Sequence, residues 1–321
     1  MKDIQELGII IEQKIQQIHY PNNPNLLYDP VEYIMGLQGK RIRPILVLMA
    51  HQLFDENLEN ALYPAIAIEL FHNFTLLHDD IMDKAPLRRG SPTVHEKWNS
   101  NVAILSGDVM MIQAYQLLAK ADSNKIKEIL TVFSKTAIEV CEGQQWDMDF
   151  EIQSDVSLAD YMKMIENKTA VLLAVSLQIG GITAGASKEN QNNLYHFGLN
   201  MGIAFQLKDD LLDAFGNSNE FGKQIGGDIL ANKKTFLYLK ALQLANDKQK
   251  ESLVNYFTTQ EQTEQKVMGV KTIFSDLDIP KHIKDMMKAY YTKAMRHLSS
   301  IDSNNKTPLI AFAAKLMDRI S

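Results

Sequence analysis

The sequence predicts an all-α protein, and two observations carry this prediction. Apolar residues recur at three- and four-residue spacing along most of the 321 residues, beginning with Ile4, Leu7, Ile11, Ile15 and Ile18. Alternating runs of β-branched residues bounded by hairpin turns, which are typical of antiparallel sheets, are essentially absent. The chain also lacks a linker rich in Pro, Gly or Ser and a repeat with a period of about 20 to 50 residues. We therefore expect one large helical domain over residues 1–321.

Prolines delimit the expected helices of the first half. The first helix spans residues 4–18 and ends before Pro21. Pro30 and Pro64 each suit the first turn of a helix, because proline lacks the N–H that such a position leaves unpaired. The pattern thus predicts the following helices: 30–36, 45–54, 64–83, 101–121 and 124–150.

Caps and apolar runs delimit the helices of the second half. Ser157 and Asp160 have the spacing of a capping box, and the helix that follows continues into the apolar run 170–186. Because that run contains Ser176, Gln178 and three glycines and is too short to span a membrane, we interpret it as buried core. Ser187 caps a helix that continues to Gly216. After a glycine-rich loop, helical spacing returns in the segments 234–245, 247–257, 261–274, 280–298 and 308–320.

Composition excludes several classes of protein. A hydrophobic share of 45% is ordinary for a globular protein with a large core, and a net charge of −6 offers no basic field to a nucleic acid. The N-terminus has acidic and amide residues where a signal peptide needs a basic start and an apolar region. The single cysteine, Cys141, cannot form an internal disulfide, so we expect a small buried thiol in a cytoplasmic protein.

Two clusters of aspartates carry the strongest chemical signal. Each has the spacing i, i+1 and i+4 at the end of an apolar helix, and the clusters lie 130 positions apart, on helices that can face each other across a bundle. Two carboxylates about 4 Å apart repel by about 4 kcal/mol at a moderate dielectric, so six of them require cations. Mg²⁺ prefers such oxygen donors, and we expect it to be bound by Asp79, Asp80, Asp83, Asp209, Asp210 and Asp213.

Basic residues lie close in sequence to these clusters and suit phosphate groups. Arginine matches phosphate oxygens with two parallel hydrogen bonds, and lysine supplies a mobile charge. For Arg41 and Lys234, a solvated surface charge is the simpler interpretation, and His78 is interpreted as a helix-face residue. The set as a whole comprises Lys40, Arg41, Arg43, Arg88, Arg89, Lys168, Lys223, Lys233 and Lys234.

In this order along residues 39–233, the motifs resemble those of the trans-isoprenyl diphosphate synthases. The matching segments are Gly-Lys-Arg-Ile-Arg-Pro (39–44), Leu-Leu-His-Asp-Asp-Ile-Met-Asp (76–83), Arg-Arg-Gly (88–90), Lys-Thr (168–169), Phe-Gln (205–206) with Asp-Asp-Leu-Leu-Asp (209–213), and the lysine-bearing loop 222–233. The resemblance implies an isoprenoid synthase fold, which is a helical bundle around a deep apolar pocket. It also implies a homodimer. From the charge, the single cysteine and the length of the apolar run, we expect no nucleic-acid partner, a cytoplasmic location and no transmembrane segment.

The resemblance assigns two diphosphate sites. Lys40, Arg43, His72 and Arg89 would bind isopentenyl diphosphate, while the allylic diphosphate would be held by Arg88, Lys168, Lys223 and Lys233. Three Mg²⁺ ions on the aspartates would promote ionisation of the allylic C–O bond as Lewis acids. Thr169 and Gln206, together with Lys168, would stabilise the carbocation that the isopentenyl double bond attacks.

The product length should be set by bulky residues on the helix before Asp79. Phe74 lies five positions before that aspartate, Thr75 lies four before it, and Phe71 is one turn away. In the resembling family, an aromatic residue at the position of Phe74 is typical of short-chain enzymes. We expect geranylgeranyl diphosphate (C20), with farnesyl diphosphate (C15) as the first alternative and a medium-chain polyprenyl product as the second.

Other functions fit the sequence less well. A class I terpene cyclase shares the first aspartate motif but has no use for Lys40 with Arg43, and a phosphohydrolase on His78 and Asp79 lacks further histidine ligands. A non-catalytic subunit of a heteromeric synthase should have lost aspartates, whereas all six are present. Lys208 interrupts the second motif and either screens its carboxylates or points away from them.

Overall fold

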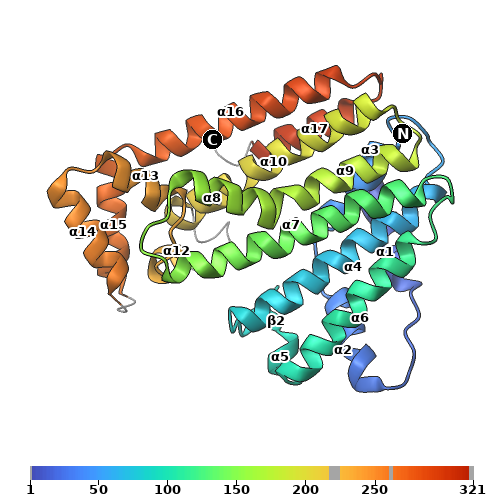
Figure 1. Cartoon of the computed structure of the whole chain (residues 1–321), viewed down its shortest axis with the longest axis horizontal. Helices are drawn as coiled ribbons and strands as arrows, with labels where there is room; N and C mark the ends of the chain where they lie inside the picture. Colours follow the sequence, from blue (N-terminus) through green and yellow to red (C-terminus); the bar gives the residue numbers. More distant parts are fainter. Residues whose placement is uncertain (1, 217–224, 260–262, 318–321) are drawn as a thin grey trace. The chain divides into compact units, whose positions relative to one another are not determined.

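The structure is a computed structural model that describes residues 2–216, 225–259 and 263–317. The predicted all-α class is confirmed (Figure 1). Within the described residues, the β-structure is one antiparallel pair, β1 (Leu87–Arg88) and β2 (Ser91–Pro92), in which Leu87 pairs with Pro92. The chain forms two compact units: residues 1–134, 175–195 and 301–309 make the first, and residues 135–174, 196–300 and 310–321 the second. The single domain remains a prediction, as does the deep apolar pocket.

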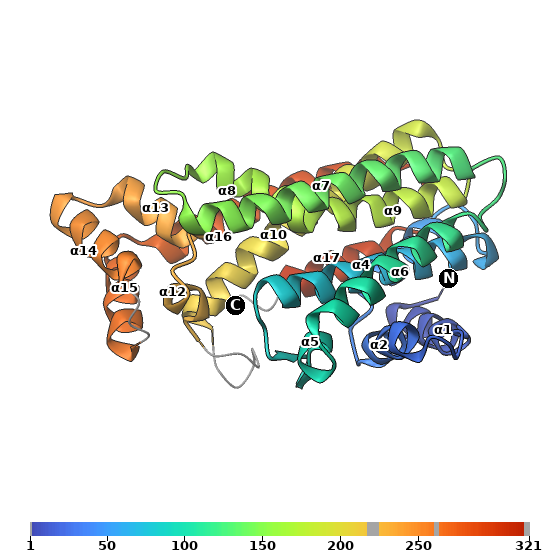
Figure 2. The ribbon, with the colours of Figure 1, turned by 60° about the horizontal axis from the view of Figure 1, so that its bottom comes forward.

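The first unit is built around α4, which carries the first aspartate cluster. In both views α4 lies beside α6 (Figures 1 and 2), and Gly107 of α6 allows this approach, because a Cβ there would lie 2.4 Å from Nε2 of His78. Burial of side chains such as Ile66, Leu70 and Leu77 stabilises α4, at about 1.5 to 3 kcal/mol for each. The helices of this unit are α1 (Ile4–Gln16), α2 (Asn25–Gly36), α3 (Ile42–His51), α4 (Glu59–Met82), α5 (Val94–Lys97) and α6 (Ser100–Leu118).

The second unit surrounds the C-terminal part of α10, which carries the second aspartate cluster. Its core includes Leu207 and Leu211 of that helix together with Phe236 and Ile283. The helices of this unit are α8 (Leu158–Ile165), the π-helical turn η1 (Glu166–Ala170), α12 (Gly227–Leu230), α13 (Phe236–Leu244), α14 (Asp247–Thr258), α15 (Glu264–Asp276) and α16 (Ile279–Ser300). Both units receive residues from α7 (Ile126–Ile152), α9 (Val171–Thr183), α10 (Lys188–Phe215) and α17 (Thr307–Met317).

Most predicted helices are present, and the differences have identifiable causes. The capping box of Ser157 and Asp160 is formed as predicted. Pro30 and Pro64, in contrast, lie inside α2 and α4 rather than in their first turns. Each helix gains a turn before its proline, and in α4 that turn buries Ala61, which offsets the backbone hydrogen bond that proline cannot make.

Cys141 is exposed, so the prediction of a buried thiol is wrong. It lies on a side of α7 that also exposes Ile138, one turn earlier, and the helix period therefore directs it to solvent. The apolar run of α9 is buried as predicted, for example at Val175 and Ile179. Across the described residues, no helix has the length and apolar character needed to cross a membrane.

Candidate active site

The first aspartate cluster lies at the C-terminal end of α4. Asp79 and Asp80 belong to the last turn of the helix and Asp83 is its C-cap. The β1–β2 hairpin returns the chain to this end, and its Arg88 donates from Nε to both carboxylate oxygens of Asp80, at 3.0 and 3.1 Å. Nη2 of Arg88 lies 3.8 Å from Oδ2 of Asp79. The structure thus brings Arg88 to the aspartates, and its predicted role at the allylic diphosphate stays a prediction.

Burial and charge determine the protonation of this pair. Burial raises the pKa of the 2% exposed Asp80, and the ion pair with Arg88 opposes that rise. Burial lowers the pKa of Arg88, but Asp80, Asp79 and Asp83 outweigh it, so this pKa is raised. The hairpin therefore supplies a permanent positive charge to the acidic end of α4.

Three of the four groups predicted to bind isopentenyl diphosphate lie together in the first unit. Nη1 of Arg43 lies 3.0 Å from Nε2 of His72, and the imidazole must accept this hydrogen bond because a guanidinium only donates. The Arg89 guanidinium packs on Gly39, where a Cβ would lie 2.8 Å from Nη1, and it donates to the Leu37 carbonyl at 3.4 Å. The fourth group, Lys40, is exposed and follows Gly39 directly.

The positive charges in this group repel one another. Burial lowers the pKa of Arg43 to about 10, and the nearby Arg89 contributes to the decrease. Burial, followed by the charges of Arg43, Arg89, Arg88 and Arg41, lowers the pKa of His72 well below its ordinary value. His72 is therefore neutral at pH 7. An anion between these groups would relieve the repulsion.

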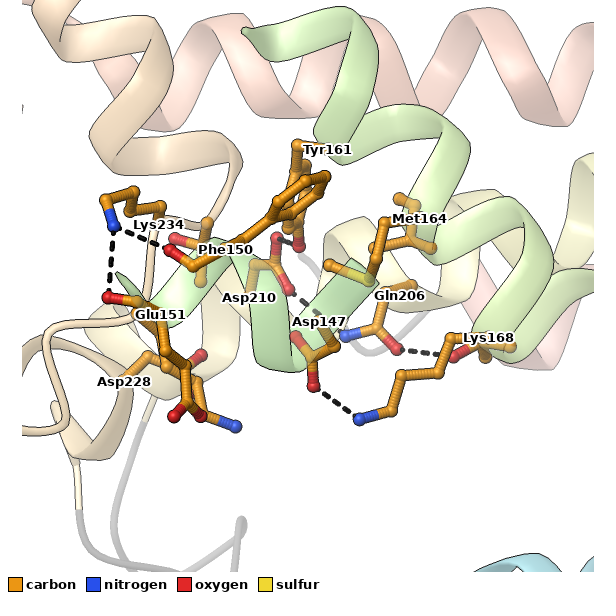
Figure 3. A pocket seen from close by; sticks show the side chains of 14 residues that line it. Asp147, Phe150, Glu151, Tyr161, Met164, Lys168, Gln206, Asp210, Asp228 and Lys234 are labelled. Carbon is orange, nitrogen blue, oxygen red and sulfur yellow. Dashed lines mark hydrogen bonds and ion pairs between the residues drawn. The ribbon is translucent and has the colours of Figure 1, made fainter. Parts of the chain in front are cut away.

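In the second cluster, Asp210 is the centre of a hydrogen-bond chain that Figure 3 shows. Tyr161 of α8 donates its hydroxyl to Oδ2 of Asp210, and Gln206 donates from Nε2 to Oδ1 at 3.2 Å. Thr169 of η1 in turn donates to Oε1 of Gln206 at 3.2 Å. Burial raises the pKa of Asp210 to about 7, and the charges of Asp228 and Asp209 contribute, while the Tyr161 hydrogen bond opposes the increase.

A pocket of the second unit joins this chain to three lysines. Nζ of Lys168 lies 2.5 Å from Oδ2 of Asp147, on α7 (Figure 3). Lys234 donates to the Phe150 carbonyl at 2.6 Å, so its interpretation as a solvated charge is wrong, and burial lowers its pKa. Lys233 also lines this pocket. Lys223 lies outside the described residues.

The remaining residues of the second motif have structural contacts. Oδ2 of Asp213 accepts the backbone N–H of Asp228 at 3.0 Å, which ties α10 to α12. Lys208 is 4% exposed and donates to the Leu316 carbonyl of α17, so of its two predicted arrangements the structure favours the one that points away. Asp209 is half-buried on the same helix.

The donor sets of both clusters suit Mg²⁺. They offer carboxylate oxygens only, which are the ligands that this ion prefers. Among the residues that the structure describes, no three His, Cys, Asp or Glu side chains are gathered around one point that could hold a metal. Mg²⁺ does not require such a cage, because one or two carboxylates usually hold it together with waters and substrate phosphates.

The predicted chain-length residues lie in an aromatic cluster of the first unit. The ring of Phe74 lies 5.6 Å from that of Phe71 and 4.7 Å from that of His78, and Phe71 contacts Phe133 at 5.1 Å. The Thr75 hydroxyl donates to the His72 carbonyl, which turns it toward its own helix. Phe74 is therefore backed by further aromatic rings.

Sequence reasoning missed two residues of the site. Asp147 lies 21 positions before Lys168 in a polar stretch of α7, and nothing in that stretch indicates the ion pair. Tyr161 fits the apolar face of α8, where its hydroxyl gave no separate signal. Both could have been found only from the packing of α7, α8 and α10.

Comparisons with known proteins identify the family of the chain. The chain matches the polyprenyl synthetase family over residues 24–275. It is 33% identical to a geranylgeranyl diphosphate synthase of Methanosarcina mazei, over 96% of this chain and 94% of the relative. It is 38% identical to one of Saccharolobus solfataricus, over 84% and 82% of the two chains. A solved geranylgeranyl pyrophosphate synthase matches with a TM-score of 0.95 and 43% identity over 100% of both chains. A second solved structure, a geranylgeranyl pyrophosphate synthetase from Pyrococcus horikoshii Ot3, matches with a TM-score of 0.92 and 34% identity, over 98% of this chain and 97% of that one.

Proposed function

The chain belongs to the polyprenyl synthetase family, and on this premise we propose that it condenses isopentenyl diphosphate with allylic diphosphates to give geranylgeranyl diphosphate. Its allylic substrates would be dimethylallyl, geranyl and farnesyl diphosphate. The observation that carries the C20 product is the name that the four relatives compared above share, since each is a geranylgeranyl diphosphate (pyrophosphate) synthase. The bulk of Phe74 near the aspartates is consistent with a short chain.

Isopentenyl diphosphate would bind at Lys40, Arg43, His72 and Arg89, which we call the isopentenyl clamp. The mutual repulsion of the arginines supports this assignment, because a diphosphate would offset it. Neutral His72 accepts from Arg43 and so fixes the direction of that guanidinium. The second His72 nitrogen is then the protonated one and can donate to a phosphate oxygen.

The allylic diphosphate would bind at Arg88, Lys168, Lys223 and Lys233. Arg88 and Lys168 are each paired with a carboxylate, Asp80 and Asp147 respectively. Substrate phosphates must therefore compete with these carboxylates. Because a buried carboxylate without a counter-charge is costly, Mg²⁺ would have to replace Arg88 as the partner of the 2% exposed Asp80.

Magnesium would be held by the six aspartates, with three ions expected when substrate is bound: Asp79, Asp80, Asp83, Asp209, Asp210 and Asp213. Bound Mg²⁺ would supply Lewis acidity at the allylic diphosphate. The protein would hold the reacting carbon beside the side-chain oxygens of Thr169 and Gln206. The hydrogen bond from Thr169 to Oε1 of Gln206 fixes the orientation of the Gln206 amide, so that its nitrogen faces Asp210. These oxygen dipoles favour developing positive charge, and released pyrophosphate would accept the proton.

A homodimer is the proposed assembly. On α6, Ile104, Leu105 and Ile112 are 43%, 59% and 56% exposed, and their spacing puts them on one side of the helix. Large apolar side chains gathered in this way are typical of subunit interfaces. Sedimentation of the protein and of Leu105→Glu would test the dimer. A cytoplasmic location remains a prediction.

Turnover tests the proposed reaction. The purified protein is incubated with labelled isopentenyl diphosphate, MgCl₂ and each of the three primers, and label is counted in the organic extract after phosphatase treatment. We expect incorporation that depends on Mg²⁺ and falls by at least about 100-fold in Asp80→Asn and Asp210→Asn. A wild-type protein that binds both substrates without incorporating label would instead support the non-catalytic subunit.

A further inference from the structure

Arg41 has a buried position that its neighbours in the sequence do not share. It is 5% exposed, and its backbone is in the left-handed region with φ 44° at the N-cap of α3. Its guanidinium donates from Nε to Glu12 at 2.8 Å, from Nη1 to Glu69 at 2.8 Å, and from Nη2 to the carbonyls of Met35 and Leu37 at 2.6 and 3.1 Å. With its nitrogens engaged in this way, Arg41 is not available to a substrate.

Glu69 is the buried partner of this arginine. It is 1% exposed, and Oε1 also accepts a hydrogen bond from Asn73 at 3.1 Å. Its negative charge raises the pKa of Arg43 and of Arg89 against the effect of burial. A single carboxylate therefore serves as counter-charge to two arginines of the isopentenyl clamp while it is bonded to a third.

The same contacts fix the turn that carries the clamp. The Leu37 carbonyl accepts from Arg41 and from Arg89, and Gly39 lies under the Arg89 guanidinium. Lys40 and Arg43 flank Arg41 in sequence, so the left-handed residue determines how the chain turns between them. Moving the Arg41 guanidinium would move both.

We propose that Arg41 and Glu69 are a positioning pair that holds the isopentenyl clamp in the geometry of a diphosphate, an inference that rests on the proposed function. Neither residue touches substrate. Lysine cannot replace Arg41, because one ammonium group cannot reach acceptors that lie on α1, α2 and α4 at once. Glutamine cannot replace Glu69, because it removes the charge that compensates Arg43 and Arg89.

Steady-state kinetics on Arg41→Lys and Glu69→Gln test the proposal. KM is measured separately for isopentenyl diphosphate and for farnesyl diphosphate, with the melting temperature and near-UV circular dichroism of each variant. We expect KM for isopentenyl diphosphate to rise about 10- to 100-fold and KM for farnesyl diphosphate to change less than about twofold, since a small displacement affects the displaced site only. The matched controls are Arg296→Lys and Glu128→Gln. Arg296 is exposed, and Glu128 forms an ion pair with Lys188, whose side chain is 75% exposed. Both controls should leave the two KM values unchanged.

Several outcomes would overturn the proposal. Equal changes in both KM values, or a lower melting temperature with unchanged KM values, would make the pair a stabilising ion pair only. If Arg41→Lys does not fold, Glu69→Gln decides, and if neither folds the pair serves the fold and not the clamp. A wild-type protein without turnover would contradict the proposed function instead. The pair is then judged by calorimetric affinity for isopentenyl diphosphate, which must fall in the variants.

Discussion

Asp210 should destabilise the ligand-free protein at neutral and alkaline pH. Its pKa is about 7 in the folded protein against an ordinary value of 3.8, and burial is the main cause. At pH values between 3.8 and about 7, the folded state therefore keeps the Asp210 proton while the unfolded state has released it. The free energy of unfolding falls as the pH rises through this range. About three pH units at 1.36 kcal/mol each give a cost of about 4 kcal/mol above pH 7.

Asp210→Asn removes this cost and reports it directly. The amide has nearly the same volume, and its oxygen can still accept from Tyr161. At pH 5 the wild type bears only about one third of this cost, whereas at pH 8 it bears all of it. Asp210→Asn should therefore raise the free energy of unfolding over that of the wild type by up to about 3 kcal/mol more at pH 8 than at pH 5. Urea unfolding at both pH values in EDTA measures it. The same variant should lose turnover, because a proposed magnesium ligand is gone.

An equal change in unfolding free energy at pH 5 and pH 8 would refute this reasoning, since Asp210 would then not carry a raised pKa. Tyr161→Phe is the matched comparison. It removes the hydrogen bond that opposes the pKa increase and should make the pH dependence steeper than in the wild type. A shallower dependence would contradict the assigned direction.

Three further predictions concern single side chains. Phe74→Ala should give longer products by radio-chromatography, although Phe71 and Phe133 behind it limit the gain, and an unchanged product would exclude Phe74 as the floor. Lys168→Ala should raise KM for farnesyl diphosphate about 10- to 100-fold, as expected for a lost charged hydrogen bond, and a larger effect on isopentenyl diphosphate would contradict the assignment. Lys208→Met should lower the unfolding free energy by about 1 to 3 kcal/mol in urea without changing product length, and altered products would show that Lys208 acts on the site.

The sequence alone was sufficient wherever local chemistry decides the structure. The i, i+1, i+4 spacing placed both aspartate clusters on helix ends, and the Ser157 capping box marked the start of α8 correctly. Arg88 lies beside Asp80 of the aspartate motif that precedes it, and Arg43 lies beside His72, while the diphosphates assigned to both arginines stay predictions. These features depend on residues within a few turns of one another or on their chemical type.

Features that depend on packing could not be predicted. Arg41 and Lys234 were interpreted as surface charges, whereas Arg41 is buried against Glu69 and the Met35 carbonyl, and half-buried Lys234 donates to the Phe150 carbonyl. Cys141 is exposed because it lies on the side of α7 that faces solvent. A single small residue does not show which face of a helix is buried, so the sequence could not predict this. Pro64 lies within α4 because burial of the preceding turn outweighs a missing hydrogen bond.

The most direct measurement of the central claim is the length of the product. The wild-type protein is incubated with labelled isopentenyl diphosphate in excess over dimethylallyl diphosphate, and the dephosphorylated alcohols are separated by reversed-phase chromatography against standards. We predict geranylgeraniol, C20, as the main product. A main product of C15, or of C30 and longer, would contradict the assignment.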